Sequence, residues 1–222
     1  MDKFSVIIPT IWKGETLNDL LINLYNCELI EEVILINNDN KNSKAIPLHD
    51  KLIYVEPQKN LFVNPSWNLG VRMAKSNNII ISNDDILFDV HYFINSLIDV
   101  DKNYVNFEEL GIIGMHSDNY KLESNSSNVS FKSHGMSESA GGWACLIAFN
   151  KKNWTPIPEQ LKIYYGDNFL LGLGKQILDM EGLKVETKMS SSANTSVDWV
   201  KKVTDNDLIE WLKIINNGKI TN

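Results

Sequence analysis

The segment NIIISNDDILFD (78–89) places two adjacent carboxylates directly after a strand-like run and then returns to apolar residues. Asp84 and Asp85 are like charges side by side, which costs folding free energy unless solvent or a bound cation compensates them. Hard oxygen ligands of this kind suit Mg²⁺ or Mn²⁺. The segment therefore indicates either a solvated strand end or a divalent-cation site.

The residues around this segment alternate between strand and helix patterns. The strands expected from short apolar runs are 4–10, 31–39, 51–57, 78–82 and 110–115. The helices expected from helical spacing of apolar residues are 15–26, 64–75 and 91–100. Strands that alternate with helices of about a dozen residues imply right-handed crossovers and a largely parallel sheet. The sequence thus predicts an α/β fold.

The second half of the chain is less regular. Residues 117–139 are polar and rich in Ser and Asn, so a long loop is expected there. The other expectations are a strand at 141–150, a turn running into a helix at 163–178, a short strand at 182–187 and a helix at 204–218 with Thr204 as N-cap. With no internal repeat and no Pro- or Gly-rich linker in the sequence, we expect a single domain, 1–222.

The composition narrows the classes of function. The formal net charge of the 222 residues is −7, which argues against nucleic acid as a partner. The two cysteines, Cys27 and Cys145, fit no metal-ligand or redox spacing. The chain starts with a strand pattern rather than a secretory leader, and no apolar run approaches the roughly 18 residues of a membrane span. We therefore expect a cytoplasmic protein without a transmembrane segment.

Polar residues follow three of the expected strands. Thr10, the pair Asn37–Asn38 and the cluster Asn83–Asp85 each stand where a strand ends. Ligands of parallel α/β sheets bind beyond the carboxyl ends of the strands. These side chains are therefore expected to share one site.

Four segments in this order, FSVIIPT, EEVILINND, NLFVNPSWNLG and IIISNDDILFD, resemble the nucleotide-sugar-binding half of family 2 glycosyltransferases. The resemblance covers residues 4–90 and extends more weakly to GGWACLIAFNKKNW and IPEQLKIYYGDNFLL. It implies a GT-A fold, a mixed and mainly parallel central sheet flanked by helices. Residues 1–115 would form the nucleotide-sugar-binding half and 116–222 the acceptor-side half. A UDP- or dTDP-type sugar donor and Mn²⁺ or Mg²⁺ as cofactor are likewise implied.

The resemblance assigns donor-binding roles to residues of the first half. Thr10 would line the nucleotide pocket and Asn37 or Asn38 would contact the base, although Asn37 stands where many members have Asp. Asn60, Asn68 and Gly70 match an asparagine–glycine element beside the diphosphate, in which Phe62 replaces a usual glycine.

The acid cluster Asn83-Asp84-Asp85 aligns with the family's metal-binding acids in two registers, because it begins with Asn. Asp85 would be the main metal ligand, with Asp84 as second ligand, and Asp84 or Asn83 would face the ribose. His116 or His134 could complete the metal shell. Gly142, with Gly141 before it, would let the backbone approach the donor sugar, and Trp143 would form a stacking wall unless it is a core residue.

A catalytic base is expected in Tyr165-Gly166-Asp167-Asn168, which is similar to a Tyr-Gly-Glu-Asp segment of the family. Asn168 cannot accept a proton at neutral pH, so the candidate is Asp167. The alternative is that Asp167 caps a helix beginning at Asn168. In that case a retaining mechanism, or another acid such as Glu138 or Asp118, would be required.

The function that the sequence favours is metal-dependent transfer of a sugar from a nucleoside diphosphate to the hydroxyl of a glycan or another acceptor, with inversion. One rival is a sugar nucleotidyltransferase, but IPTIWKGETL lacks the Gly-rich basic loop of that class. The other rival is a nucleotide-sugar-binding module without catalysis, which Asn83 and Asn168 keep open.

Overall fold

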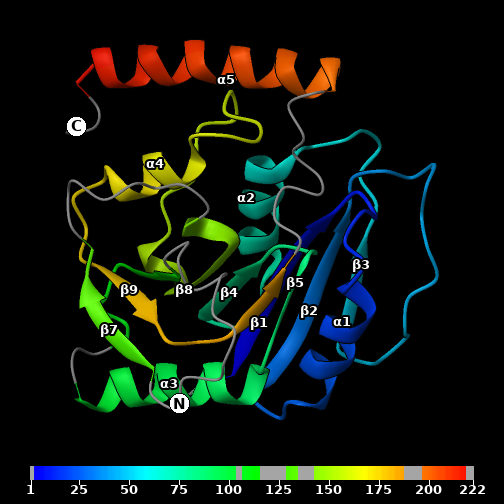
Figure 1. Cartoon of the computed structure of the whole chain (residues 1–222), viewed down its shortest axis with the longest axis vertical. Helices are drawn as coiled ribbons and strands as arrows, with labels where there is room; N and C mark the ends of the chain where they lie inside the picture. Colours follow the sequence, from blue (N-terminus) through cyan, green and yellow to red (C-terminus); the bar gives the residue numbers. More distant parts are fainter. Residues whose placement is uncertain (1–2, 104–106, 116–128, 135–142, 188–196, 219–222) are drawn as a thin grey trace.

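The central feature of the molecule is an eight-stranded sheet with strand order β3-β2-β1-β4-β8-β6-β9-β7 (Figure 1). The computed structural model describes residues 3–103, 107–115, 129–134, 143–187 and 197–218. The strands of this sheet are β1 (Phe4–Thr10), β2 (Ile30–Asn37), β3 (Leu52–Val55), β4 (Asn78–Ser82), β6 (Ile112–Met115), β7 (Ser130–Ser133), β8 (Leu146–Asn150) and β9 (Ile177–Glu181).

The sheet is mixed, as the sequence predicted. The pairs β1–β2, β1–β4, β2–β3 and β6–β9 are parallel. β8 runs antiparallel to both β4 and β6, and β7 runs antiparallel to β9. The carboxyl ends of β1, β2 and β4, which are neighbours, therefore meet at one edge of the sheet.

Helices cover both faces of the sheet. Residues of α1 (Leu17–Asn26) and α3 (Val90–Asn103) pack in one apolar cluster, and residues of α2 (Val63–Met73) and α4 (Gly166–Leu171) pack in the other. The last helix, α5 (Asp198–Asn216), lies outside these layers on the side of α2 and α4 (Figure 1). None of the helices in the described ranges is long and apolar enough to cross a membrane.

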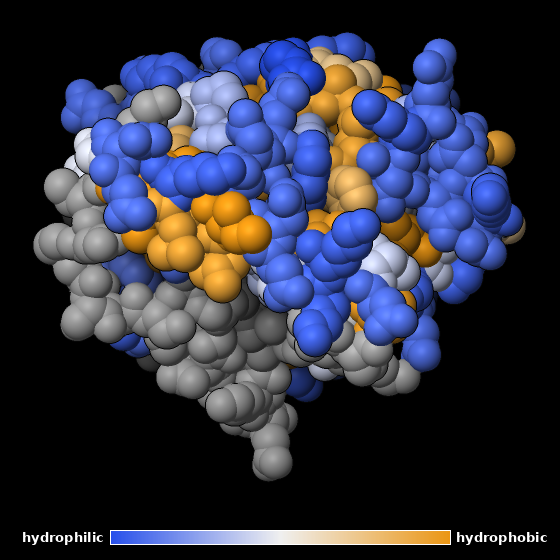
Figure 2. Space-filling view, turned by 90° about the horizontal axis from the view of Figure 1, so that it is seen from above, coloured by the Kyte–Doolittle hydropathy of each residue, from blue (hydrophilic) through white to orange (hydrophobic). Residues whose placement is uncertain are grey.

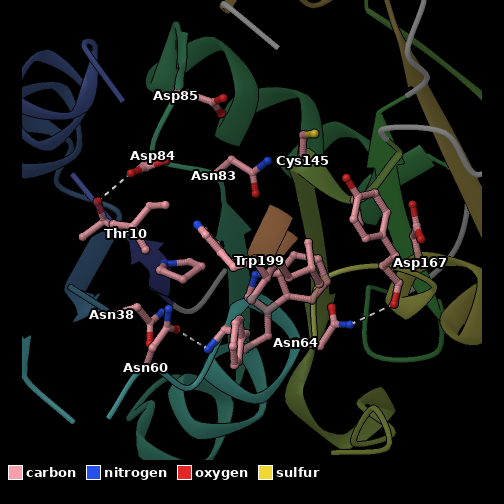
Figure 3. A pocket seen from close by; sticks show the side chains of 18 residues that line it. Thr10, Asn38, Asn60, Asn64, Asn83, Asp84, Asp85, Cys145, Asp167 and Trp199 are labelled. Atoms are coloured by element: carbon pink, nitrogen blue, oxygen red, sulfur yellow. Dashed lines mark hydrogen bonds between the residues drawn. The ribbon is translucent and has the colours of Figure 1, made fainter. Parts of the chain in front are cut away.

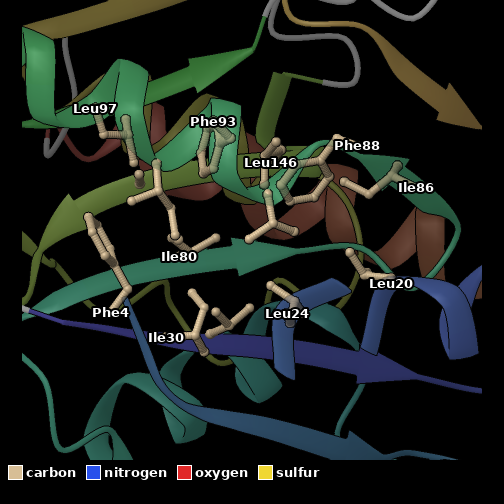
Figure 4. Close-up of a cluster of buried hydrophobic side chains, with 14 of the residues drawn as sticks. Phe4, Leu20, Leu24, Ile30, Ile80, Ile86, Phe88, Phe93, Leu97 and Leu146 are labelled. Carbon is tan, nitrogen blue, oxygen red and sulfur yellow. The ribbon is translucent and has the colours of Figure 1, made fainter. Parts of the chain in front are cut away.

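The larger core lies between the sheet and the helices α1 and α3 (Figure 4). Leu20 and Leu24 of α1 meet Ile80 of β4, and Phe93 and Leu97 of α3 extend the same cluster. All five side chains are at most 2% exposed. Burial of each contributes about 1.5–3 kcal/mol, so the strands that carry the candidate site rest on a well-packed base.

The apolar residues after the acidic pair form a strand of their own. β5 (Ile86–Phe88) pairs antiparallel with β10 (Val185–Thr187) in a separate two-stranded sheet. Ile86 and Phe88 are buried in the larger core. The acidic pair thus lies in a short turn between two strands that are both anchored by buried residues.

Several expected boundaries in the second half are wrong. The helix expected within 163–178 ends at Leu171, and β9 already begins at Ile177. α5 starts at Asp198, so Thr204 is not its N-cap; the Thr204 hydroxyl donates instead to the Val200 carbonyl one turn earlier. The strand expected at 141–150 is a 3₁₀ turn, Trp143–Cys145, followed by β8. β7 falls within the expected loop 117–139, most of which lies outside the described residues.

Candidate functional site

A cavity of about 270 Å³ opens where β1, β2 and β4 end, and we call it the strand-end cavity (Figure 3). Its volume is slightly below the range of about 300–1,000 Å³ that is typical of small-molecule sites. Thr10 is the last residue of β1, Asn38 follows β2, and the segment 83–85 follows β4. The opposite walls come from the loop before α2 and its first turn, the segment before α4 and its first turn, and the first turn of α5. They include Asn60, Phe62, Asn64, Tyr164, Asp167 and Trp199.

Asp84 and Asp85 are both on the cavity wall and both nearly buried, with 5% and 8% of their surface exposed. The Thr10 hydroxyl donates to Asp84 Oδ2 at 2.5 Å, and the Trp12 backbone N–H donates to the Thr10 hydroxyl at 2.8 Å. Desolvation by burial, followed by repulsion from Asp85, raises the pKa of Asp84 to about 6, although the bonds from Thr10 and the Gly14 backbone act in the opposite direction. The pair is therefore held at an electrostatic cost.

Gly14 is a residue that the sequence reasoning missed. A Cβ atom at this position would lie 2.1 Å from the Asp84 carbonyl oxygen, so only glycine lets the loop after β1 approach so closely. The same loop supplies the backbone hydrogen bond to the Asp84 carboxylate. The available signal was the single glycine in IPTIWKGETL.

The chemistry of the wall fits a divalent cation bound together with a phosphate. In the described part of the chain, no group of three or more His, Cys, Asp and Glu side chains could enclose a metal ion. Mg²⁺-type sites are commonly built from one or two carboxylates plus substrate phosphates and water. Asp84 and Asp85 provide this number of carboxylates.

Of the two histidines proposed for the metal shell, only His134 lies in the described residues, and it contacts Asp179 instead. The Nδ1 atom of His134 lies 2.9 and 3.0 Å from the two carboxylate oxygens of Asp179 on β9, and His134 is not on the cavity wall. His116 lies outside the described residues.

Asp167 lies on the same cavity, in the first turn of α4. Its Oδ1 accepts the backbone N–H of Asn168 at 3.0 Å. Desolvation raises the pKa of Asp167 to about 6, so the carboxylate is largely ionised at pH 7 and close to the operating range of a general base. Helix α4 begins at Gly166 with Tyr165 as N-cap, so Asp167 is inside the helix rather than its cap. Glu138 and Asp118 lie outside the described residues.

The two asparagines at the end of β2 have different surroundings. Asn37 is fully buried and off the cavity wall, where its Oδ1 accepts the Trp12 indole N–H at 2.7 Å and its Nδ2 donates to Ser43 and Tyr54. Asn38 is on the wall. Its Oδ1 accepts the Leu61 backbone N–H at 2.9 Å, which ties the loop after β3 to the cavity.

Asn60 is on the wall, but the other two residues of the asparagine–glycine element are not. Asn68 donates to the Ile157 carbonyl at 2.8 Å and accepts from the Ile157 N–H at 3.0 Å. A Cβ on Gly70 would lie 2.3 Å from Ile7 Cγ2, so Gly70 permits close contact between α2 and β1. Asn68 therefore holds α2 against the segment around Ile157, and Gly70 lets α2 pack closely on β1.

Trp143 is a core residue and is not part of the cavity wall, where it was expected to stack on the sugar. It is 1% exposed, and its indole N–H donates to Asp179 at 2.7 Å. Gly142, which was expected beside the donor sugar, lies outside the described residues.

The wall residues that were not anticipated from sequence include Asn64, Cys145 and Trp199. Trp199 is 42% exposed, and its ring centroid is 6.4 Å from that of Phe62. Phe62 has φ 66° and ψ −172°, a backbone conformation that is essentially restricted to glycine. The family that the sequence resembles usually has glycine at this position, which agrees with that conformation. Asn64 had one usable signal, its polar side chain in the expected first turn of a helix beside the site.

Neither a protein-family model nor a curated protein matches the sequence. The structure is similar to S. aureus TarS 1–349 in complex with UDP-GlcNAc, with a TM-score of 0.59, 15% identity, and coverage of 94% of this chain and 66% of that one. It is similar to GalNAc-T7 with UDP, GalNAc and Mn²⁺ (TM-score 0.58, 12% identity, coverage 84% and 44%). It is also similar to the mannosyltransferase PcManGT from Pyrobaculum calidifontis in complex with GDP-Man and Mn²⁺ (TM-score 0.53, 14% identity, coverage 79% and 53%).

These likenesses concern the fold. The chain has the GT-A fold of glycosyltransferases, as the sequence predicted. It spans between about two fifths and two thirds of the lengths of these three proteins.

Proposed function

We propose that the protein is a metal-dependent, family 2-like glycosyltransferase that moves a sugar from a nucleoside diphosphate to an acceptor hydroxyl with inversion. The observation that carries the proposal is the charge of the strand-end cavity. Its wall contains the carboxylates of Asp84, Asp85 and Asp167, and no Lys, Arg or His is among the described residues that line it. A diphosphate would be repelled from this wall unless a divalent cation accompanied it.

The similar structures support a nucleotide-sugar donor. TarS is in complex with UDP-GlcNAc, and PcManGT is in complex with GDP-Man and Mn²⁺. For this chain we propose a UDP- or dTDP-type donor, Mn²⁺ or Mg²⁺ as cofactor, and a glycan or another hydroxyl compound as acceptor. The acceptor side would be formed by residues 116–222.

The acid cluster would hold the cation and the ribose end of the donor. Asp85 and Asp84 are the proposed ligands, and the hydrogen bond from Thr10 fixes the orientation of Asp84. When bound, the cation supplies compensation for the negative charge that develops on the departing diphosphate. Asn83 would contact the ribose, and Asn38 and Asn60 would border the nucleotide.

Asp167 is the proposed general base. Its Oδ1 accepts the Asn168 N–H, and we assign Oδ2 to the acceptor proton. As the acceptor oxygen bonds to the anomeric carbon, the bond from that carbon to the diphosphate breaks and the acceptor proton passes to Asp167. Attack from the face opposite the leaving group inverts the anomeric configuration.

The geometry also bears on the rival functions. A nucleotidyltransferase would need cationic side chains from the loop after β1, but Lys13 of that loop is exposed and is not on the cavity wall. A binding module without catalysis shares the cavity with the proposed enzyme, so the two are separated by turnover. We favour the enzyme because Asp167 shares the cavity with the acid pair.

Thermal-shift measurements with nucleoside diphosphates and nucleotide sugars, with and without Mn²⁺, test the proposal. A ligand at about 100 times its Kd stabilises the native state by about 2.7 kcal/mol. For a chain of this size that corresponds to a rise in Tm of about 5–10 °C. We expect the rise with one class of nucleotide, and only when Mn²⁺ is present.

The matched variants are Asp85→Asn and Asp50→Asn, the second of which changes an exposed carboxylate that is not on the cavity wall. Asp85→Asn should abolish the Mn²⁺-dependent shift, and Asp50→Asn should retain it. Absence of a shift with every diphosphate would refute the proposal. A Mn²⁺-dependent shift without release of nucleoside diphosphate from any sugar donor would favour the binding module.

A further inference from the structure

The segment that leads to Asp167 has no regular secondary structure. Residues 161–165 form bends and coil before α4 starts, and Ile163 and Tyr164 of this segment are on the wall of the strand-end cavity. The position of Asp167 therefore depends on what holds these few residues.

Asn64 of α2 holds the segment from one side. Its backbone N–H donates to the Lys162 carbonyl at 3.0 Å, and its side-chain Nδ2 donates to the carbonyls of Leu161 and Tyr164 at 3.2 and 3.3 Å. Gly166 completes this contact, because a Cβ there would lie 2.3 Å from Asn64 Oδ1. The carbonyl groups of the segment are thus fixed against α2.

Asp207 of α5 holds the amide groups of the same segment. Its Oδ1 accepts the Lys162 N–H at 2.9 Å, and its Oδ2 accepts the N–H groups of Ile163 and Tyr164 at 2.8 and 3.0 Å. Successive backbone N–H groups that converge in this way form an anion-binding concavity. The described residues provide no ion pair for Asp207, so these amide dipoles compensate its charge.

A ring contact adds to the hold of α5 on the segment. Tyr165 has φ 62°, the left-handed conformation that turns the chain into α4. Its ring stacks on that of Trp211, with centroids 5.8 Å apart and planes at 10°. α5 therefore contacts both the amides before the turn and the residue that makes it.

Full burial along α5 is confined to few positions, and one of them is Asp207, which makes this contact. Of its nineteen residues only Val200 and Asp207 are buried, and Asp207 is 0% exposed. Leu208, Ile209 and Leu212 are instead exposed, and Figure 2, which views the molecule from above, from the side of α5, shows apolar areas among hydrophilic ones. A helix that only filled the core would bury its leucines rather than a carboxylate.

We propose that Asp207 is a positioning residue that sets the place of the general base Asp167 through the amides of residues 162–164. This inference rests on the proposed function of Asp167. The competing explanation is that Asp207 only anchors α5 to the domain. The two differ in what happens to turnover when the fold and the donor site remain intact.

The test uses Asp207→Asn, which keeps the size of the side chain but replaces one acceptor oxygen by an NH₂ group that faces N–H donors. The control is Val200→Ala, which weakens the other buried contact of α5. For each variant we would measure donor affinity with Mn²⁺, kcat for donor hydrolysis without acceptor, and amide hydrogen exchange. The donor is the nucleotide sugar that stabilises the wild type most, with UDP-GlcNAc tested first.

We expect Asp207→Asn to bind the donor as the wild type does, to lose about 10- to 100-fold in kcat, and to exchange the amides of residues 162–168 faster. Val200→Ala should keep kcat within about twofold at matched temperature below its Tm. Equal kcat values in the two variants, or an Asp207→Asn variant whose donor affinity falls as much as its kcat, would overturn the inference. If the wild type hydrolyses no donor, the proposed function fails instead. In that case unchanged exchange of residues 162–168 in Asp207→Asn overturns the positioning role as well.

Discussion

Replacing Asp167 by Asn should make the protein more stable while it removes catalysis. Desolvation raises the pKa of this carboxyl from 3.8, its ordinary value, to about 6. At about 1.4 kcal/mol for each factor of ten in proton affinity, the ionised carboxylate costs the native state about 3 kcal/mol at pH 7. Asn carries no charge, and its side-chain oxygen can still accept the Asn168 N–H that Asp167 accepts now.

The sign of the pH dependence follows from the same shift. Below pH 3.8 the carboxyl is protonated in both the native and the unfolded state, so its ionisation costs the native state nothing. As the pH rises from 3.8 to about 6, the unfolded state loses its proton first, and the native state becomes less stable. The gain in stability of Asp167→Asn over the wild type should therefore be complete above about pH 6 and should disappear toward pH 4.

Urea denaturation of the wild type and Asp167→Asn at several pH values between 4 and 7 measures this difference. An advantage of about 3 kcal/mol corresponds to a rise in Tm of about 6–12 °C at pH 7. Asp50→Asn, at an exposed position, should show no such dependence. The reasoning fails if Asp167→Asn is not stabilised at pH 7, if its advantage is the same at pH 4 and pH 7, or if it retains wild-type turnover.

Two further substitutions separate packing roles from donor binding. Gly70→Ala brings a methyl group within 2.3 Å of Ile7 Cγ2. We therefore expect urea titrations to show a free energy of unfolding lower by about 1–3 kcal/mol, while the affinity for the donor is retained. A loss of donor affinity at unchanged stability would instead indicate that Gly70 contributes to donor binding. Phe62 has φ 66° and ψ −172°, a conformation that glycine adopts without strain. In the same urea titrations Phe62→Gly should therefore be more stable than Phe62→Ala by about 1 kcal/mol or more, although glycine is usually the less stable of the two. A more stable Ala variant would show that this backbone is not strained.

Most of the first half of the fold could be predicted because β1 and β4 are buried along their whole length and β2 is buried at all but one residue. All five residues of β4 are buried, and its expected bounds, 78–82, are those observed. In the second half β7 reads SFKS at the sheet edge, where polar residues leave no apolar run. β9 contains the buried Asp179, whose partners His134 and Trp143 are 45 and 36 positions away in the chain. A buried charge whose partners are distant in the chain interrupts the apolar run by which a buried strand is predicted from sequence.

At the site, the sequence predicted which strand ends meet but not which side chain at each end faces the cavity. Asn37 pairs with Thr10 across β1 and β2, and the Asn38 N–H donates to the Thr10 carbonyl at 2.8 Å. Successive side chains of an extended chain point to opposite sides, so only one of the two asparagines can face the cavity. That choice depends on the twist and register of the finished sheet, and it is Asn38.

The same limit applies along α2. The first turn of α2, with Asn64, reaches the cavity, whereas Asn68 lies one turn further along the helix, about 6 Å away at 1.5 Å per residue. Both are asparagines in a similar local pattern, so the motif alone could not separate a wall residue from a packing residue.

The start of α5 shows why the contact of Asp207 with the segment before Asp167 could not be predicted from the sequence. The stretch TDNDL resembles an N-terminal capping signal, since Thr204 precedes acidic residues, but the helix already begins at Asp198. Asp207, an acidic residue in that expected first turn, would have been credited to the helix dipole. In the structure its carboxylate is fully buried against amides that lie 43 to 45 positions earlier in the chain. A carboxylate in an apparent first turn thus has two physical explanations, and only the distant N–H groups distinguish them.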